Sequence, residues 1–253
     1  MNLEESPIRT PVRNAHTPSS SLGNVLSWIV TLLVPVILVL ASVRVLLNPA
    51  FLSFEYNSPK FPPDTYGFTL EDRLYWSNID LDYLLNQEGI SFLGDLHFSD
   101  GSAAYNPREL QHMVDVKIVL QKALLVWYFS LGAMFILGVW AWRGGWLNFY
   151  FHGLSRGGFA TSALILLIIA FVLFGFRIFF VAFHQVFFET GTWIFNYSDT
   201  LIRLFPERFW RDVFIFVGLL SFSGGLMTGF VLRSSSRSNS KLIFKSEKLQ
   251  HIP

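Results

Sequence analysis

Hydrophobic residues gather in four long runs along the chain, and polar residues fill the segments between them. An α-helix rises about 1.5 Å per residue, so roughly 20 apolar residues cross the ~30 Å hydrocarbon core of a bilayer. Each of the four runs reaches that length. We therefore predict an all-α membrane protein with transmembrane helices at residues 25–47, 118–142, 159–183 and 209–232.

Composition supports lipid as the main solvent of this chain. Of its 253 residues, 52% are hydrophobic and 15% are charged, whereas about 25% of the residues in a soluble domain are charged. The first run is too long for a cleavable signal peptide, and no small-residue cleavage site follows it. Pro35 inside this run is expected to kink the helix rather than end it.

Lysine and arginine predict the orientation, because they concentrate in the cytoplasmic loops of membrane proteins. Segment 48–117 holds eleven acidic and four basic residues, so it should form a small extracytoplasmic cap of α-helix with a short β element. Both termini should then be cytoplasmic. The remaining segments are expected to be a disordered tail at 1–24, a cytoplasmic loop at 143–158, an aromatic extracytoplasmic loop at 184–208 and a basic, disordered tail at 233–253.

The charge balance and the absence of cysteine narrow the possible chemistry. Without cysteine the chain has no disulfides and no cysteine nucleophile. A net charge of +1 gives no argument for nucleic acid, and we predict no such partner. The basic tail is explained by membrane topology and by attraction to anionic lipid headgroups.

Local signals predict the elements of the cap. Thr69 can cap a helix, Asp72 completes a capping box with it, and Gly89 can end that helix. The alternation in residues 90–101 predicts a short hairpin that turns near Gly94 and Asp95.

A second helix should begin at Asn106 and continue unbroken into the second span. Asn106 is a good N-cap, and Pro107 fits the first helical position. This register places His112 roughly 10 Å above the apolar run, at headgroup depth. Glu109, His112 and Asp115 recur every three residues and should share one face.

The third span carries a second histidine to the same depth. Arg177 and His184 are seven residues apart, which places them on one helix face, and His184 falls at the outer end of that span. Beyond it, Ser198 or Asp199 should cap a short interfacial helix, and Pro206 should start the last span. In that last span, Gly225 and Gly229 form a GxxxG motif that predicts helix packing.

Two histidines from separate helices at one depth suit proton transfer on a lipid ester or amine. Arg177 has two readings: it either stabilises an oxyanion or extends to the headgroups. Glu109 and His112 form half of a di-iron signature, but no second half follows, so we predict neither a metal nor a cofactor. There is no G-x-S-x-G motif for a serine lipase.

The stretches "ELQHMVDVK", before the second span, and "FHQVFFETGTWIFNYSDTLIRLFPERFW", after the third, resemble the bacterial lipoprotein intramolecular transacylases. The similarity covers roughly residues 25–235, and the polar N-terminal extension and longer tail depart from the short forms of the family. The resemblance implies a multi-pass enzyme of the bacterial plasma membrane with an outward-facing site. It implies that a diacylated lipoprotein N-terminus and membrane lipids are the partners.

The family activity moves the sn-2 acyl chain of a diacylglyceryl-cysteine to the α-amino group of that cysteine, which gives an N-acyl lyso-form lipoprotein. The resemblance maps the two functional histidines onto His112 and His184, and either could be the base and the other the acid. Arg177 or backbone amides could stabilise the oxyanion. Supporting roles are expected for Glu109, Asp115, Lys117, Glu189, Trp193 and Asp199.

Two other classes of function remain open from the sequence. One is a non-enzymatic membrane scaffold or assembly factor whose aromatic outer loops bind a partner. The other is a different lipid enzyme, either a hydrolase or an intermolecular acyltransferase. A transporter is less favoured, because the four spans show no repeat and no pair of broken helices.

Overall fold

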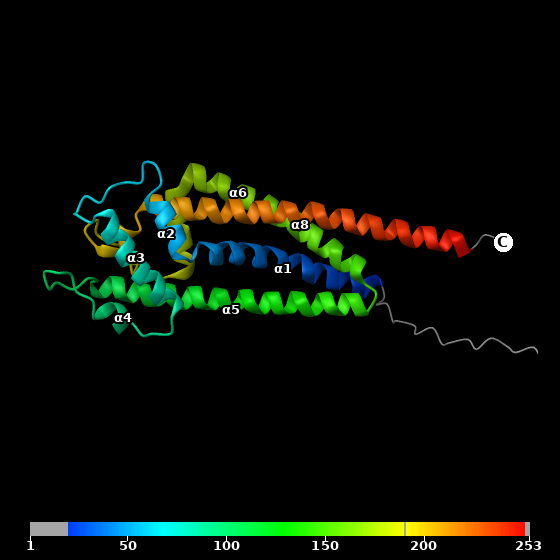
Figure 1. Ribbon diagram of the computed structural model, residues 1–253, viewed down its shortest axis with the longest axis horizontal. Coiled ribbons are helices and arrows are strands. Elements are labelled where there is room, and N and C mark those ends of the chain that lie inside the picture. The colour runs from blue at the N-terminus through cyan, green and yellow to red at the C-terminus, as the bar shows by residue number, and fades with distance from the viewer. Residues whose placement is uncertain (1–19, 190, 251–253) are drawn as a thin grey trace, which may run out of the picture.

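The computed structural model describes residues 20–189 and 191–250, with side chains up to residue 232. Among these residues, four helices are long and apolar enough to cross a membrane. They lie side by side as a bundle with a small helical cap at one end (Figure 1). The four are α1 (Ser20–Leu46), α5 (Pro107–Arg143), α6 (Leu147–Phe187) and α8 (Glu207–Gln250).

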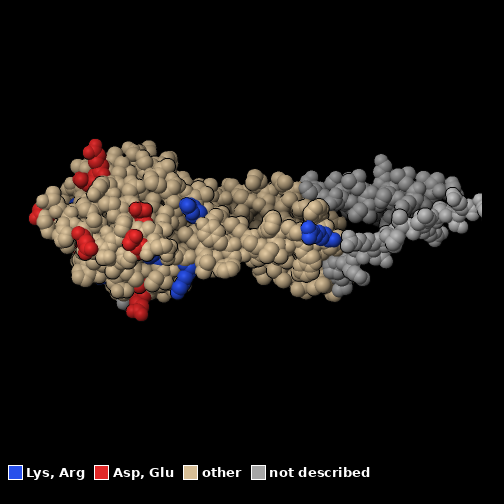
Figure 2. Space-filling model, turned by 60° about the horizontal axis from the view of Figure 1, so that its bottom comes forward, with Lys and Arg blue, Asp and Glu red and all other residues tan. Residues whose placement is uncertain are grey.

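Short helices build the cap, and the outer starts of α5 and α8 pack against them. In Figure 1 the first residues of α1 and the last residues of α8 both lie at the opposite end of the bundle. Acidic side chains gather on the cap, while Figure 2 shows a bundle surface with few charges, most of them Lys or Arg. The cap helices are α2 (Pro49–Tyr56), α3 (Leu70–Leu85), α4 (Ser91–Gly94) and α7 (Thr200–Leu204).

The predicted capping signals are confirmed at α3 and α5. Thr69 and Asp72 form a reciprocal capping box at the start of α3. Asn106 and Glu109 do the same for α5, and Pro107 is its first residue. These signals satisfy the free N–H groups of the first turn. Helix α5 therefore starts at Pro107 and continues unbroken to Arg143.

Small residues let α6 lie close to both α1 and α8. A Cβ atom added at Gly158 would come within 2.5 Å of the backbone oxygen of Gly225, and one added at Gly157 would come within 2.8 Å of Thr31 O. The Oγ atom of Ser155 donates a 2.8 Å hydrogen bond to the backbone oxygen of Gly229. The predicted packing role of Gly225 and Gly229 is therefore confirmed.

The prediction of a hairpin turn at Gly94 and Asp95 is wrong. Residues Ser91–Gly94 form the short helix α4, and the reversal comes later, where His97 and Ala103 form an antiparallel bridge. Gly101 makes that turn possible with a φ of 85°, a conformation that glycine adopts without strain. This bridge is the β structure found in the described residues.

Several helix boundaries differ from the predicted segments. Helix α1 begins at Ser20, inside the expected N-terminal tail, and passes through Pro35; residues 1–19 lie outside the described part of the chain. Helix α8 continues to Gln250, where a disordered tail was expected. Helix α6 begins at Leu147, within the expected loop, and its backbone departs from helical angles at Gly175.

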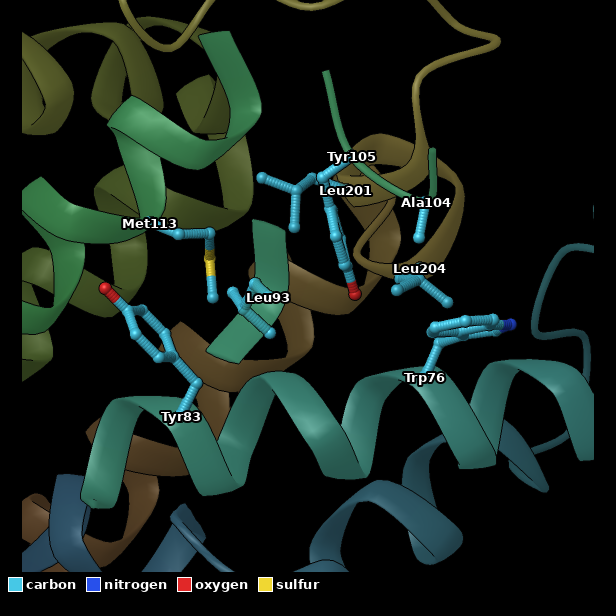
Figure 3. Close-up of a cluster of buried hydrophobic side chains, with 8 residues drawn as sticks. All are labelled: Trp76, Tyr83, Leu93, Ala104, Tyr105, Met113, Leu201 and Leu204. Atoms are coloured by element: carbon cyan, nitrogen blue, oxygen red, sulfur yellow. The ribbon is translucent and has the colours of Figure 1, made fainter. Parts of the chain in front are cut away.

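A hydrophobic core fixes the cap onto the start of α5. Figure 3 shows its side chains converging from α3, α4, α7 and the start of α5. Burial of such apolar side chains holds the first turns of α5 in register with α7. The core consists of Trp76, Tyr83, Leu93, Ala104, Tyr105, Met113, Leu201 and Leu204.

Candidate active site

His112 reaches the site from the second turn of α5. The capping box that begins this helix fixes where each residue of the first turns points. The imidazole is buried, with 9% of the residue exposed, and its Nδ1 atom has no hydrogen-bond partner. A buried ring nitrogen without a partner is free to meet a substrate group.

His184 reaches the same place from the last turn of α6 and is also buried, with 8% exposed. Its Nδ1 atom lies 2.8 Å from the backbone oxygen of Phe180, one turn earlier. Because a carbonyl oxygen only accepts, Nδ1 must carry the hydrogen in this contact. Neutral His184 therefore has its free lone pair on Nε2.

The two imidazoles face each other. Their ring centroids are 6.2 Å apart, and the planes are inclined by 20°. At this separation one bound substrate can contact both rings. The expectation that His112 and His184 lie close together is confirmed.

Aromatic side chains enclose this pair. Phe188 and Phe195 contact His112 edge-on, with centroid distances of 5.0 and 5.4 Å. The ring centroid of Trp193 lies 4.8 Å from that of His184. The ring centroid of Phe180 lies 4.0 Å from that of the same imidazole. Such rings exclude water and lower the local dielectric, which strengthens any interaction between the histidines and a substrate.

The loop that supplies these rings is tied to α5. Arg108 donates a 2.9 Å hydrogen bond from Nη1 to the backbone oxygen of Ile194, between Trp193 and Phe195. The backbone N–H of Asn196 donates to Asp199 Oδ2 at 2.8 Å. The first bond thus holds the loop to α5, and the second closes a turn within the loop just before α7.

Glu109 joins α5 to α7 rather than contacting a histidine. Its Oε2 atom accepts the backbone N–H of Asn106 at 2.8 Å, and its Oε1 atom accepts that of Leu201 at 2.7 Å. Only 2% of the residue is exposed. Glu109 therefore joins the first turn of α5 to α7 through buried hydrogen bonds.

Asp115 and Lys117 have partners away from the two histidines. Asp115 accepts a hydrogen bond from Gln111 on the same helix. Lys117 donates to Asn86 Oδ1 at 2.9 Å and to the backbone oxygen of Glu88 at 2.6 Å. Lys117 thus clamps the end of α3 to α5, and neither residue orients His112.

The other expected supporting residues lie along the loop. Glu189 is exposed and accepts hydrogen bonds from Thr192 through its backbone oxygen. Asp199 occupies the N-cap position of α7, but its carboxylate bonds Asn196 instead of an amide of α7. Trp193 is the member of this group that contacts a histidine.

Arg177 lies apart from the histidine pair. It is exposed, and with Ile178, Val181, Ala182 and Gln185 it lines a shallow hollow on the outer surface of α6. It is two turns, about 10 Å, from His184 along the helix. The loop covers His184 and leaves Arg177 open, so the geometry favours a headgroup contact over an oxyanion contact.

The aromatic enclosure is the part of the site that sequence reasoning missed. Phe180, Phe188 and Phe195 were not singled out, although the density of aromatic residues in this loop was a usable signal. Within the described residues, no three His, Asp or Glu side chains come together as metal ligands.

Comparisons with known proteins agree with this architecture. The model of the family described as lipoprotein intramolecular transacylase Lit matches residues 28–210. An uncharacterized protein of Aquifex aeolicus (strain VF5) is 31% identical over 209 residues, which cover 83% of this chain and 94% of the relative.

Solved structures show the same fold at low sequence identity. The membrane integral lipoprotein intramolecular transacylase Lit from Bacillus cereus matches with a TM-score of 0.73 and 20% identity, over 88% of this chain and all of that one. A histidine-to-alanine variant of that protein matches with a TM-score of 0.69 and 18% identity, over 87% of this chain and 96% of the other.

Proposed function

Since the chain belongs to the lipoprotein intramolecular transacylase family, a family of membrane-integral transferases that process lipoproteins, we propose that it moves the sn-2 acyl chain of a diacylglyceryl-cysteine to the α-amino group of the same residue. The product is an N-acyl, S-monoacylglyceryl lipoprotein. The facing imidazoles of His112 and His184, 6.2 Å apart in an aromatic enclosure, are the observation that carries this proposal.

The reaction needs proton transfer more than a protein nucleophile, because nucleophile and electrophile belong to one substrate. The α-ammonium group, whose pKa is about 7.7–8.0 in a free chain, first loses a proton. Its nitrogen then attacks the ester carbonyl and forms the C–N bond. Collapse of the tetrahedral intermediate breaks the C–O bond to the glyceryl group, and the departing oxygen takes up a proton.

The hydrogen bond to Phe180 favours His184 as the base. That contact fixes the hydrogen on Nδ1 and leaves Nε2 to accept the proton from the attacking nitrogen. His112 is then the group that delivers a proton to the glyceryl oxygen. The nitrogen gives up two protons in all, one before it attacks and one as the amide forms. One proton is supplied to the glyceryl oxygen and the other leaves to solvent, so the two histidines return to their starting total charge.

The enclosure contributes by positioning the substrate and by excluding water. Holding amine and ester in a near-attack geometry can contribute about 7–11 kcal/mol to the barrier reduction. Water that entered would compete with the amine for the ester and release free fatty acid. A site buried under aromatic rings favours transfer over hydrolysis.

The site would face outward from a bacterial plasma membrane. The segment 48–117 is acidic, while α5 ends at Arg143 and the tail of α8 is rich in Lys and Arg. The positive-inside tendency therefore puts both termini in the cytoplasm and the cap outside. Diacylated lipoproteins presented at the outer surface of the bilayer would meet the histidines at headgroup depth.

Expression of this chain in bacteria that lack lipoprotein N-acylation tests the proposal. Substrate and product are isomers of equal mass, so tandem mass spectrometry of the N-terminal lipopeptide is required to find the acyl chain on nitrogen. We expect fragments with an N-acylated terminal residue. Unchanged diacyl lipopeptide, with the protein present in the membrane, would contradict the proposal, and loss of one acyl chain with release of fatty acid would show a hydrolase.

A further inference from the structure

Three indole N–H groups in the described part of the chain are buried without a hydrogen-bond acceptor. They belong to Trp127, Trp146 and Trp193. Most buried polar groups in proteins are paired, and an indole nitrogen can only donate. An unpaired buried N–H is therefore unusual, but the missing acceptor alone does not define a site.

Their surroundings distinguish the three. Trp127 contacts Tyr128 on the same helix. Trp146 packs between Trp140 and Tyr150 at the other end of the bundle. Trp193 alone of the three rests on one of the facing imidazoles, with 4.8 Å between its ring centroid and that of His184. Its free donor is thus enclosed beside the proposed reaction centre.

The chain directly after Trp193 is held in place. Arg108 binds the backbone oxygen of Ile194, the next residue. Phe195, one further on, packs against His112 at 5.4 Å. A donor fixed in this way needs little rearrangement when charge develops nearby, which is the condition for effective oxyanion stabilisation.

We propose that the Nε1–H group of Trp193 donates a hydrogen bond to the carbonyl oxygen of the migrating acyl group as that oxygen becomes an oxyanion. This assignment rests on the function proposed above. When the α-nitrogen attacks, the C=O electron pair moves onto oxygen, and the indole N–H stabilises that charge. This electron pair re-forms the C=O double bond when the C–O bond to the glyceryl group breaks.

An indole suits this position better than an arginine. It supplies a donor without bringing a charge that must be desolvated in an apolar enclosure. Arg177, the donor expected from the sequence, is exposed on the surface of α6. Because Trp193 donates without giving up its proton, its removal should change the rate and leave the pH dependence in place.

The variant Trp193→Phe keeps an aromatic ring and removes the donor. Removal of one oxyanion donor typically lowers kcat by about 10²–10³-fold, and we expect a loss of that order with KM and the pH profile nearly unchanged. The matched control is Trp127→Phe, which also removes an unpaired indole N–H and lies on α5 away from the two histidines. It should keep kcat within about threefold of the parent enzyme.

A second substitution at position 193 keeps the test valid if the phenylalanine variant misfolds. Incorporation of 3-benzothienylalanine at position 193 replaces the indole N–H by sulfur and preserves the shape of the ring. Parent-like kcat in a folded variant of either kind would overturn the donor assignment, as would a rise in KM with unchanged kcat. If the parent enzyme forms no N-acyl product, the proposed function fails, and the role assigned to Trp193 fails with it. If the parent and the variants turn over equally fast, only the role assigned to Trp193 is wrong.

Discussion

The carboxylate of Glu109 accepts the backbone N–H of Leu201 through a 2.7 Å hydrogen bond and so connects the first turn of α5 to α7. The same carboxylate accepts the N–H of Asn106. His112 follows one turn later on α5. The position of this histidine thus depends on a buried tie between the cap and the loop that precedes the last span.

Glu109→Gln should weaken that tie. One oxygen becomes an NH₂ group that faces a backbone N–H, so a buried donor loses its acceptor, which typically costs about 1–3 kcal/mol. We expect a lower unfolding temperature in detergent and a lower rate of acyl transfer. Glu71→Gln, on the exposed start of α3, is the control and should change neither by much. Equal stability of the two variants would contradict this role.

Gly158→Ala should destabilise the bundle. The added Cβ atom would come within 2.5 Å of Gly225 O and 2.7 Å of Gly229 N, and backbone atoms cannot turn aside as side chains do. The helices must separate, and we expect about 1–3 kcal/mol of lost stability from overpacking. Thermal unfolding in detergent measures this.

The control for that variant is Gly132→Ala on α5, where nothing lies within 4 Å of the added atom. It should be neutral or slightly stabilising, because alanine favours helix over glycine. A parent-like unfolding temperature for Gly158→Ala would show that the close contact between α6 and α8 does not contribute to stability.

Asp80 should make stability depend on pH. It is fully buried, and burial raises the pKa of this carboxyl to about 8, although the hydrogen bond from Tyr105 opposes that shift. Unfolded, it titrates near 3.9. Between about pH 4 and pH 8 the folded state therefore holds a proton that the unfolded state releases, so this group's contribution makes the free energy of unfolding fall as pH rises.

Asp80→Asn should reduce that pH dependence, because the amide does not titrate. The measurement is the difference between the unfolding temperatures at pH 5 and pH 8, compared for the parent and the variant. Asp82→Asn, an exposed carboxyl on the same helix, should leave the parent's difference in place. A variant with the full pH dependence of the parent would rule out Asp80 as its source.

Much of this architecture could be predicted from sequence because its causes are local. The length of the four apolar runs predicted the four spans, and the capping residues Asn106 and Glu109 predicted the start of α5. The meeting of His112 and His184 followed from counting residues along two helices that share one membrane boundary. Periodicity and caps act over a few residues and need no knowledge of the partner helix.

The features that depend on packing could not be predicted. Arg177 shares a helix face with His184, but the aromatic loop covers only the end of α6, so one residue is buried and the other exposed. Lys117 binds the end of α3, a partner that lies 31 residues earlier in the sequence. Short segments such as 90–101 carry too few residues for alternation to distinguish a helical turn from a hairpin.

The central claim is that His112 and His184 act together on one lipoprotein. Tandem mass spectrometry of the N-terminal lipopeptide, in cells that express His112→Ala or His184→Ala at parent levels in the membrane, tests it most directly. His97→Ala, which replaces an exposed histidine of the cap, is the matched control. We predict N-acylated fragments from the parent and from His97→Ala and none from either variant of the pair; N-acylated product at the parent rate from a folded His112→Ala or His184→Ala would contradict the account.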